Sequence, residues 1–198
     1  MEKFAILRSG AVPLPAENVD TDQIIPARFL KATSREGFGE NLFRDWRYQP
    51  DGQPRPDFVL NNPRYAGQIL LAGKNFGCGS SREHAAWALY DAGFRVVISS
   101  YFADIFRGNA LNNGLLPLQV SEAVLQRLLA EVEREPGTGF IVDLARQVLF
   151  VPVWEENIAF DIDPYKKECL LHGYDDIDFL VNQQAAIAAY EQQRVWAY

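Results

Sequence analysis

Residues 68–99 read QILLAGKNFGCGSSREHAAWALYDAGFRVVIS, and this stretch decides the fold that the sequence predicts. The apolar run at 68–72 is typical of a buried strand, the alanine-rich segment at 82–92 of a helix, and the β-branched run at 95–99 of a second strand. This order predicts parallel strand pairing with a right-handed crossover. The glycine-spaced loop between strand and helix then falls at the sheet edge where open α/β sheets bind ligands.

The remainder of the chain extends this unit into a single α/β domain, 1–198, with a mixed sheet. Residues 14–66 are rich in turn-forming residues and predict irregular structure, and the segment from about 164 to 198 predicts a helical extension. The expected strands lie at 4–7, 11–13, 115–120, 140–144, 147–151 and 158–162, and the expected helices at 101–111, 122–134 (capped by Ser121), 164–172 and 183–194.

The composition disfavours nucleic-acid-binding and membrane-spanning proteins. The chain has 198 residues, is 48% hydrophobic and carries a net charge of −7 without any basic run, so we expect a globular protein that does not bind nucleic acid. No apolar stretch approaches the length of a membrane span, and the N-terminus lacks an apolar signal region. With only two cysteines, Cys78 and Cys169, a reducing cytoplasm is the simplest expectation.

The loop ends in Ser80, Ser81 and Arg82, directly before the predicted helix. Serine at 80 with Glu83 three residues later fits a capping box, and the local pattern alone favours a plain helix cap. Hydroxyl groups at the positive end of a helix, beside a fixed cation, also suit a bound carboxylate or a serine anion. Both interpretations stay open on this evidence.

The loop's other residues have similar alternatives. Gly77 and Gly79 allow backbone amides to approach an anion, or simply form a tight turn. Cys78 could act as the nucleophile of a hydrolase only if its thiol contacts His84. The favoured interpretations are that Cys78 is a small loop residue and that His84 is a packing residue.

A second polar segment precedes the first. Asp20, Thr21 and Asp22 form a thin ligand set for a divalent ion, so we favour loop bracing and expect no metal site. Arg28–Lys31 then place charge beside apolar bulk, which suits a substrate with a carboxylate and an alkyl group but is also typical of an ordinary surface.

Taken together, these segments resemble the family of bacterial 3-isopropylmalate dehydratase (isopropylmalate isomerase) small subunits, of the aconitase superfamily. The resemblance covers essentially the whole chain. It is carried by NVDTDQIIP at 18–26, RFL at 28–30, GFG at 37–39, DWRY at 45–48, GCGSSREHA at 77–85, FADIF at 102–106 and GN at 108–109.

The resemblance implies a three-layer β/β/α swivelling domain that closes over a cluster-bearing large subunit. It implies a hydro-lyase that interconverts 2-isopropylmalate and 3-isopropylmalate in leucine biosynthesis, by loss and re-addition of water. It implies that Ser80 takes the proton from the substrate Cα and that Ser81 and Arg82 bind a substrate carboxylate. It further implies that Arg28, Leu30 and Lys31 recognise the substrate side chain. Residues expected to support the site are Asn75, Gly77, Cys78, Gly79, Asp20, Thr21 and Asp22.

Two remote cysteines cannot supply the three thiolates that an aconitase-type four-iron, four-sulfur cluster needs. We therefore expect no cofactor on this chain, the cluster on the large subunit, and no activity of the chain alone. The alternatives are the small subunit of a related hydro-lyase (homoaconitase, citramalate or dimethylmalate dehydratase) and a stand-alone dicarboxylate-binding module.

Overall fold

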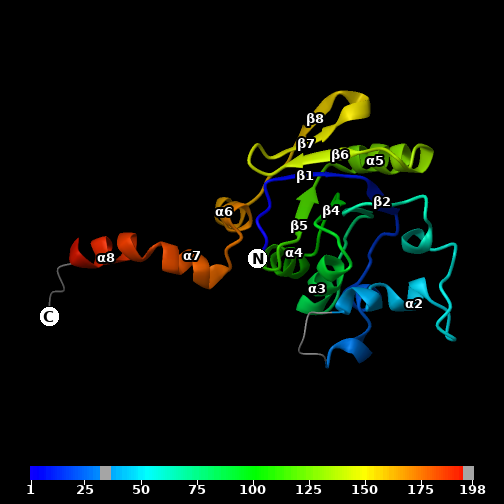
Figure 1. Cartoon of the computed structure of the whole chain (residues 1–198), viewed down its shortest axis with the longest axis horizontal. Coiled ribbons are helices and arrows are strands. Elements are labelled where there is room, and N and C mark those ends of the chain that lie inside the picture. The colour runs from blue at the N-terminus through cyan, green and yellow to red at the C-terminus, as the bar shows by residue number, and fades with distance from the viewer. Residues whose placement is uncertain (32–36, 194–198) are drawn as a thin grey trace.

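The computed structural model describes residues 1–31 and 37–193 (Figure 1). Their strands form two four-stranded sheets. One sheet is wholly parallel, and its strands stand in the order β2 (Ala11–Leu14), β3 (Ile69–Ala72), β4 (Val96–Ser99) and β5 (Leu116–Gln119). The other is antiparallel, in the order β1 (Ile6–Ser9), β6 (Phe140–Asp143), β7 (Val148–Val151) and β8 (Glu156–Ala159).

Helices fill the connections and the C-terminal part. The longer ones are α3 (Glu83–Asp91), α4 (Asp104–Asn112), α5 (Glu122–Arg134), α6 (Pro164–His172), α7 (Asp176–Asn182) and α8 (Gln184–Gln193). The N-terminal connections hold short helices, α1 (Thr21–Ile24) and α2 (Arg44–Arg47), and 3-10 turns at Ala27–Phe29, Phe38–Asn41 and Val59–Asn61; a further 3-10 turn spans Pro152–Trp154.

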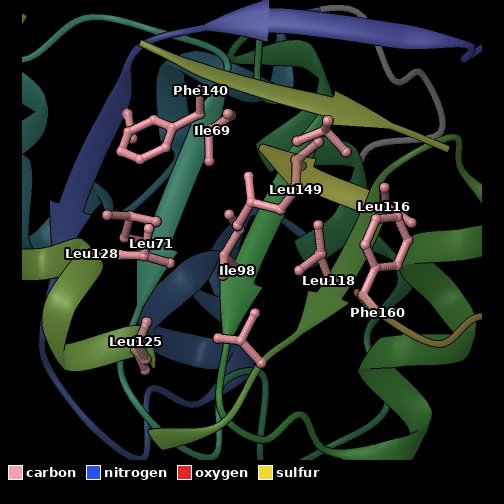
Figure 2. Close-up of a cluster of buried hydrophobic side chains, with 14 of the residues drawn as sticks. Ile69, Leu71, Ile98, Leu116, Leu118, Leu125, Leu128, Phe140, Leu149 and Phe160 are labelled. Carbon is pink, nitrogen blue, oxygen red and sulfur yellow. The ribbon is translucent and has the colours of Figure 1, made fainter. Parts of the chain in front are cut away.

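Side chains of the parallel sheet alternate between two hydrophobic cores. In β3, Ile69 and Leu71 face a core shared with the antiparallel sheet and α5, whereas Leu70 and Ala72 face one shared with α3, α4 and the N-terminal segment. Figure 2 shows the first core, where β3, β4, β5 and α5 meet residues from β6 and β7. This alternation follows from the two-residue period of a strand, and it produces the three layers, β, β and α.

Both outer strands of the parallel sheet contain a proline, Pro13 in β2 and Pro117 in β5. Proline has no backbone N–H, so in a sheet it fits only where that donor would face away from the neighbouring strand. Each of these strands pairs with a single neighbour, β3 or β4, within the parallel sheet.

The predicted β/β/α fold and its strand–helix–strand unit around 68–99 are confirmed, with the parallel and antiparallel strands in separate sheets. The predicted strand at 158–162 lies instead at Glu156–Ala159 as β8. Helix α7 falls within the predicted helical extension of 164–198, although no separate helix was predicted at its residues. Arg194, the expected end of the last helix, lies outside the described residues. None of the described helices is both long and apolar enough to span a membrane.

Candidate functional site

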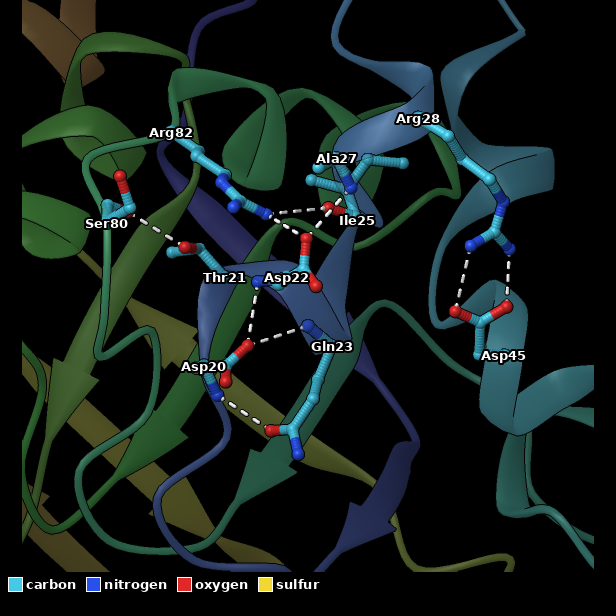
Figure 3. A network of polar contacts seen from close by, with 10 residues as sticks. All are labelled: Asp20, Thr21, Asp22, Gln23, Ile25, Ala27, Arg28, Asp45, Ser80 and Arg82. Atoms are coloured by element: carbon cyan, nitrogen blue, oxygen red, sulfur yellow. Dashed lines mark hydrogen bonds and ion pairs between the residues drawn. The ribbon is translucent and has the colours of Figure 1, made fainter.

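The loop between β3 and α3 is held in place by the segment that leads into α1. The Gly77 amide donates to the Val19 carbonyl at 2.8 Å, and the Thr21 amide donates to the Cys78 carbonyl at 2.9 Å. The buried Thr21 hydroxyl donates to the Ser80 carbonyl at 2.8 Å. Figure 3 shows Ser80 and Arg82 beside the residues of α1. The two segments that the sequence singled out are therefore in direct contact.

Asparagines and a cysteine complete this contact. Asn75, at φ 61°, donates its side-chain amide to the Asn18 side-chain carbonyl at 2.8 Å. The Cys78 thiol donates to the Asn18 backbone carbonyl at 3.3 Å. The predicted supporting residues of the 75–79 loop thus lie against the 18–22 segment.

Gly77 is the tightest position in the loop. Its φ is +77°, and a Cβ there would lie 2.2 Å from Cγ of Phe106, a buried ring that packs edge-on against Phe76. Gly79, at φ +88°, has its nearest neighbour, Asp20 Cβ, 3.4 Å from such a Cβ. Position 77 therefore needs glycine for both backbone and space.

We predict that Gly77→Ala destabilises the chain. The left-handed backbone costs about 1–2 kcal/mol for a residue with a Cβ, and the contact with Phe106 adds about 1–3 kcal/mol through overpacking. Urea unfolding of the purified chain measures the loss. Gly52→Ala is the matched control, because Gly52 has φ +85° and open space around its Cβ position, so equal losses in both variants would contradict the packing argument.

Ser80 and Ser81 are exposed, and the structure shows that the capping-box interpretation was wrong. Helix α3 begins at Glu83, with Arg82 as its N-cap residue in an extended backbone conformation (φ −136°, ψ 102°) and no side-chain cap hydrogen bond. Ser80 therefore precedes the cap by two residues, and Thr21 holds its carbonyl outside the helix. Among the described residues, neither serine hydroxyl has a hydrogen-bond partner, which leaves both available to a ligand.

Arg82 is oriented by α1. One of its terminal nitrogens, Nη1, pairs with the Asp22 carboxylate and approaches the Ile25 carbonyl at 3.5 Å (Figure 3). The Arg82 side chain is only 18% exposed. Its Nε and Nη2 donate to nothing within the described ranges, so one edge of the guanidinium remains free for a carboxylate.

Asp22 connects this arginine to the next segment. The same oxygen, Oδ1, accepts a hydrogen bond from the Ala27 amide at 2.8 Å, where the 3-10 turn that carries Arg28 begins. The hydrogen bond from Arg82, supported by the one from Ala27, lowers the pKa of Asp22 below its usual value. At neutral pH Asp22 is therefore an ionised anchor shared by two parts of the site.

Asp20 braces the start of α1 through hydrogen bonds to the backbone. Its Oδ1 accepts from the Asp22 and Gln23 amides, each at 2.8 Å, and its own amide donates to the Gln23 side chain at 2.9 Å. These bonds form a capping box on α1. In the described ranges, 1–31 and 37–193, no cluster of three or more His, Cys, Asp or Glu is suited to hold a metal ion.

Arg28 has a partner that the sequence did not reveal. Its guanidinium pairs with both carboxylate oxygens of Asp45, one contact being 3.0 Å, and this pairing lowers the pKa of Asp45 (Figure 3). Opposite charge was the only signal in the sequence, since the two residues stand 17 positions apart and share no periodic pattern. Leu30 is partly buried against the second core, and Lys31 is exposed. The following residues, 32–36, lie outside the described part.

The structure does not support a cysteine hydrolase. Burial raises the pKa of Cys78, which disfavours a thiolate nucleophile. The ring of His84 packs against Phe38 and Trp87, with centroid distances of 5.5 and 4.5 Å. His84 is a packing residue, as favoured from the sequence.

Comparison with known proteins places this geometry in a family. Residues 1–123 match the family described as the aconitase C-terminal domain. The chain is 62% identical to the 3-isopropylmalate dehydratase small subunit of Cytophaga hutchinsonii, covering 97% of this chain and 96% of that one, and 61% identical to the one of Christiangramia forsetii, covering 98% and 95%.

A solved structure shares the fold. The crystal structure of 3-isopropylmalate dehydratase from Methanocaldococcus jannaschii is similar with a TM-score of 0.67 and 24% sequence identity, covering 93% of this chain and 99% of that one. This likeness agrees with the β/β/α architecture. The chain therefore belongs to the family of 3-isopropylmalate dehydratase small subunits, built on an aconitase C-terminal domain.

Proposed function

We propose that this chain is the small subunit of a hydro-lyase that interconverts 2-isopropylmalate and 3-isopropylmalate, and that it acts in the cytoplasm together with a large subunit. The identity of 61–62% to proteins named 3-isopropylmalate dehydratase small subunit, over nearly the whole chain, carries the proposal. The chain supplies one wall of the active site, made of the 75–82 loop and the 20–31 segment.

In this proposal Ser80 is the base. Its oxygen takes a proton from the carbon next to a substrate carboxylate during dehydration and returns it during rehydration. An ordinary serine hydroxyl is a weak acid, so its anion needs stabilisation. The positive end of the nine-residue helix α3 and the cation of Arg82 both favour negative charge at this place.

Arg82 and Ser81 bind a substrate carboxylate. The free edge of the Arg82 guanidinium offers two parallel donors, which match the two oxygens of a carboxylate. Asp22 holds the opposite edge, so the arginine is fixed before substrate arrives. Arg28, Leu30 and Lys31 are proposed to recognise the substrate side chain, with Asp45 fixing the orientation of Arg28.

This chain does not fit the iron–sulfur cluster of aconitase-type enzymes. It has two cysteines, Cys78 in the loop and Cys169 buried in α6, both free, where three neighbouring thiolates are needed. We propose that the cluster resides on the large subunit. A small subunit implies such a partner, and the chain's own contribution is limited to proton transfer and carboxylate binding.

Reconstitution tests this function. The chain, the cognate large subunit and their mixture are each assayed for interconversion of the two isopropylmalates, and the mixture alone is expected to be active. Parallel assays on homologous malates distinguish the leucine-pathway reaction from that of a related hydro-lyase. Calorimetry on the isolated chain that showed tight dicarboxylate binding, with an inactive mixture, would instead support a stand-alone binding module.

A further inference from the structure

Helices α7 and α8 carry an uncovered apolar surface. They project from the body of the molecule, as Figure 1 shows at its left. Ile177, Leu180 and Val181 of α7 are 72%, 58% and 55% exposed, and Ile187 of α8 is 42% exposed. Spacing of three and four residues places the α7 members on one side of that helix. We call these four residues the apolar row.

Helix α7 is nevertheless fastened at its base. The Tyr165 hydroxyl and the Lys166 ammonium donate to Asp176 Oδ1 at 2.6 and 2.9 Å, and Lys166 also donates to the Asn112 side chain at 2.7 Å. The ring of Phe179 packs edge-on against Tyr165, with centroids 4.6 Å apart. Contacts through Asp176 and Phe179 therefore hold α7 to α6, and Lys166 joins α6 in turn to α4, while the apolar row lies on another side of α7.

Residues 173–193, which we call the arm, carry charged side chains of one sign. Residues 173–193 contain four acidic residues, Asp175, Asp176, Asp178 and Glu191, and no lysine or arginine. Only Asp176 is paired with a cation among the described residues. Two copies of the arm lying together would bring like charges close, which disfavours self-association. The complementary surface is an apolar groove bordered by lysine and arginine.

The comparisons show which proteins share residues 173–193. The general aconitase-domain match ends at residue 123, far before the arm. The Cytophaga small subunit matches 97% of this chain, leaving about six residues unmatched, fewer than the 17 residues of α7 and α8. The arm is thus shared with a protein named as a small subunit, and it lies outside the residues that match the aconitase C-terminal domain.

We propose that the apolar row of α7 and α8 is a docking surface for the large subunit, seated in an apolar groove with a basic border. This inference rests on the proposed function, because it needs a large subunit. Burial of several exposed aliphatic side chains at the centre of such a contact is the usual source of binding energy in an interface.

The test compares two full-length variants that add the same charge to the same arm. Leu180→Asp places a carboxylate in the apolar row, whereas Gln192→Asp places it on a polar position of α8. Affinity for the large subunit is measured by sedimentation or calorimetry, and activity by titration with large subunit. We expect the dissociation constant of Leu180→Asp to rise at least about tenfold. Its turnover should return to the wild-type value at saturation, and Gln192→Asp should stay within about twofold of wild type.

Circular dichroism and thermal unfolding of the isolated variants establish that the arm is intact, and Ile177→Gln provides a neutral second variant in case the charge disrupts α7. Unchanged affinity in both row variants would overturn the docking surface while leaving the proposed function in place. If the row variants lose self-association while their affinity for the large subunit is unchanged, the apolar row binds a second copy of this chain. That result would also overturn the proposed docking surface. If the wild-type chain fails to bind the large subunit, the proposed function and this inference both fall.

Discussion

Replacing Ser80 with alanine is expected to lower the turnover of the reconstituted enzyme by about 10²–10⁴-fold, the range for loss of a positioned proton-transfer group. The Ser80 hydroxyl has no partner among the described residues, so its removal breaks no contact that holds the loop. Thr21 bonds the backbone carbonyl of Ser80, and that bond survives the substitution. Assembly and substrate affinity should therefore change little. Steady-state kinetics with saturating large subunit measure the effect.

Ser121→Ala is the control for Ser80→Ala. The Ser121 hydroxyl caps α5 by accepting from the Val124 amide at 3.3 Å, so its removal costs about 1 kcal/mol of stability without touching the loop. Turnover of this control should equal that of the wild type. A Ser80→Ala enzyme with near-normal turnover would remove Ser80 as the base.

Replacing Arg82 with lysine is expected to raise the Michaelis constant by about 10- to 100-fold, as fits the loss of one to two charge-assisted hydrogen bonds. Lysine keeps the positive charge but cannot contact Asp22 with one edge and a carboxylate with the other. Turnover should fall less than the affinity does, because the charge near Ser80 is retained. Kinetics over a range of isopropylmalate concentrations separate the two effects, and unchanged values of both would contradict the assignment.

Asp22→Asn provides the matched comparison for Arg82→Lys. Asparagine keeps an oxygen acceptor for the Ala27 amide and loses the ion pair with Arg82. Because Arg82 lowers the pKa of Asp22, the wild-type ion pair is present above the ordinary aspartate pKa and is lost as the pH falls through the lowered value. Substrate affinity of the wild type should therefore weaken at acidic pH. If Asp22→Asn shows the same weakening of substrate affinity at acidic pH as the wild type, the group that titrates is not Asp22.

The regular part of the fold could be predicted from the sequence because its signals are local. Helix α5 spans Glu122–Arg134 after Ser121, and α6 spans Pro164–His172, both as expected. The pairing of β1 with β6 could not be predicted, because it joins residues more than 130 positions apart and only the folded chain brings them together. Helix α7 lies inside the predicted helical extension of 164–198 but was not delimited, because it has only seven residues and three of its apolar side chains are exposed.

The site shows the same division. Motif spacing identified the loop and the 20–22 segment, and the structure places them in direct contact. The capping pattern at Ser80 was misleading, because a tertiary contact from Thr21 outweighed a local preference. The pairing of Arg28 with Asp45 joins residues 17 positions apart, in a stretch of sequence that has no periodic signal.

The prolines in the two outer strands of the parallel sheet limit how other chains can attach. Strand addition, and the fibrils that grow from it, require an unbroken row of backbone donors along a sheet edge. Pro13 and Pro117 each remove one donor from the edges where such a row would form. A strand from another chain added at either edge would lack one backbone hydrogen bond. This sheet is therefore poorly suited to polymerise through its backbone during synthesis and before assembly.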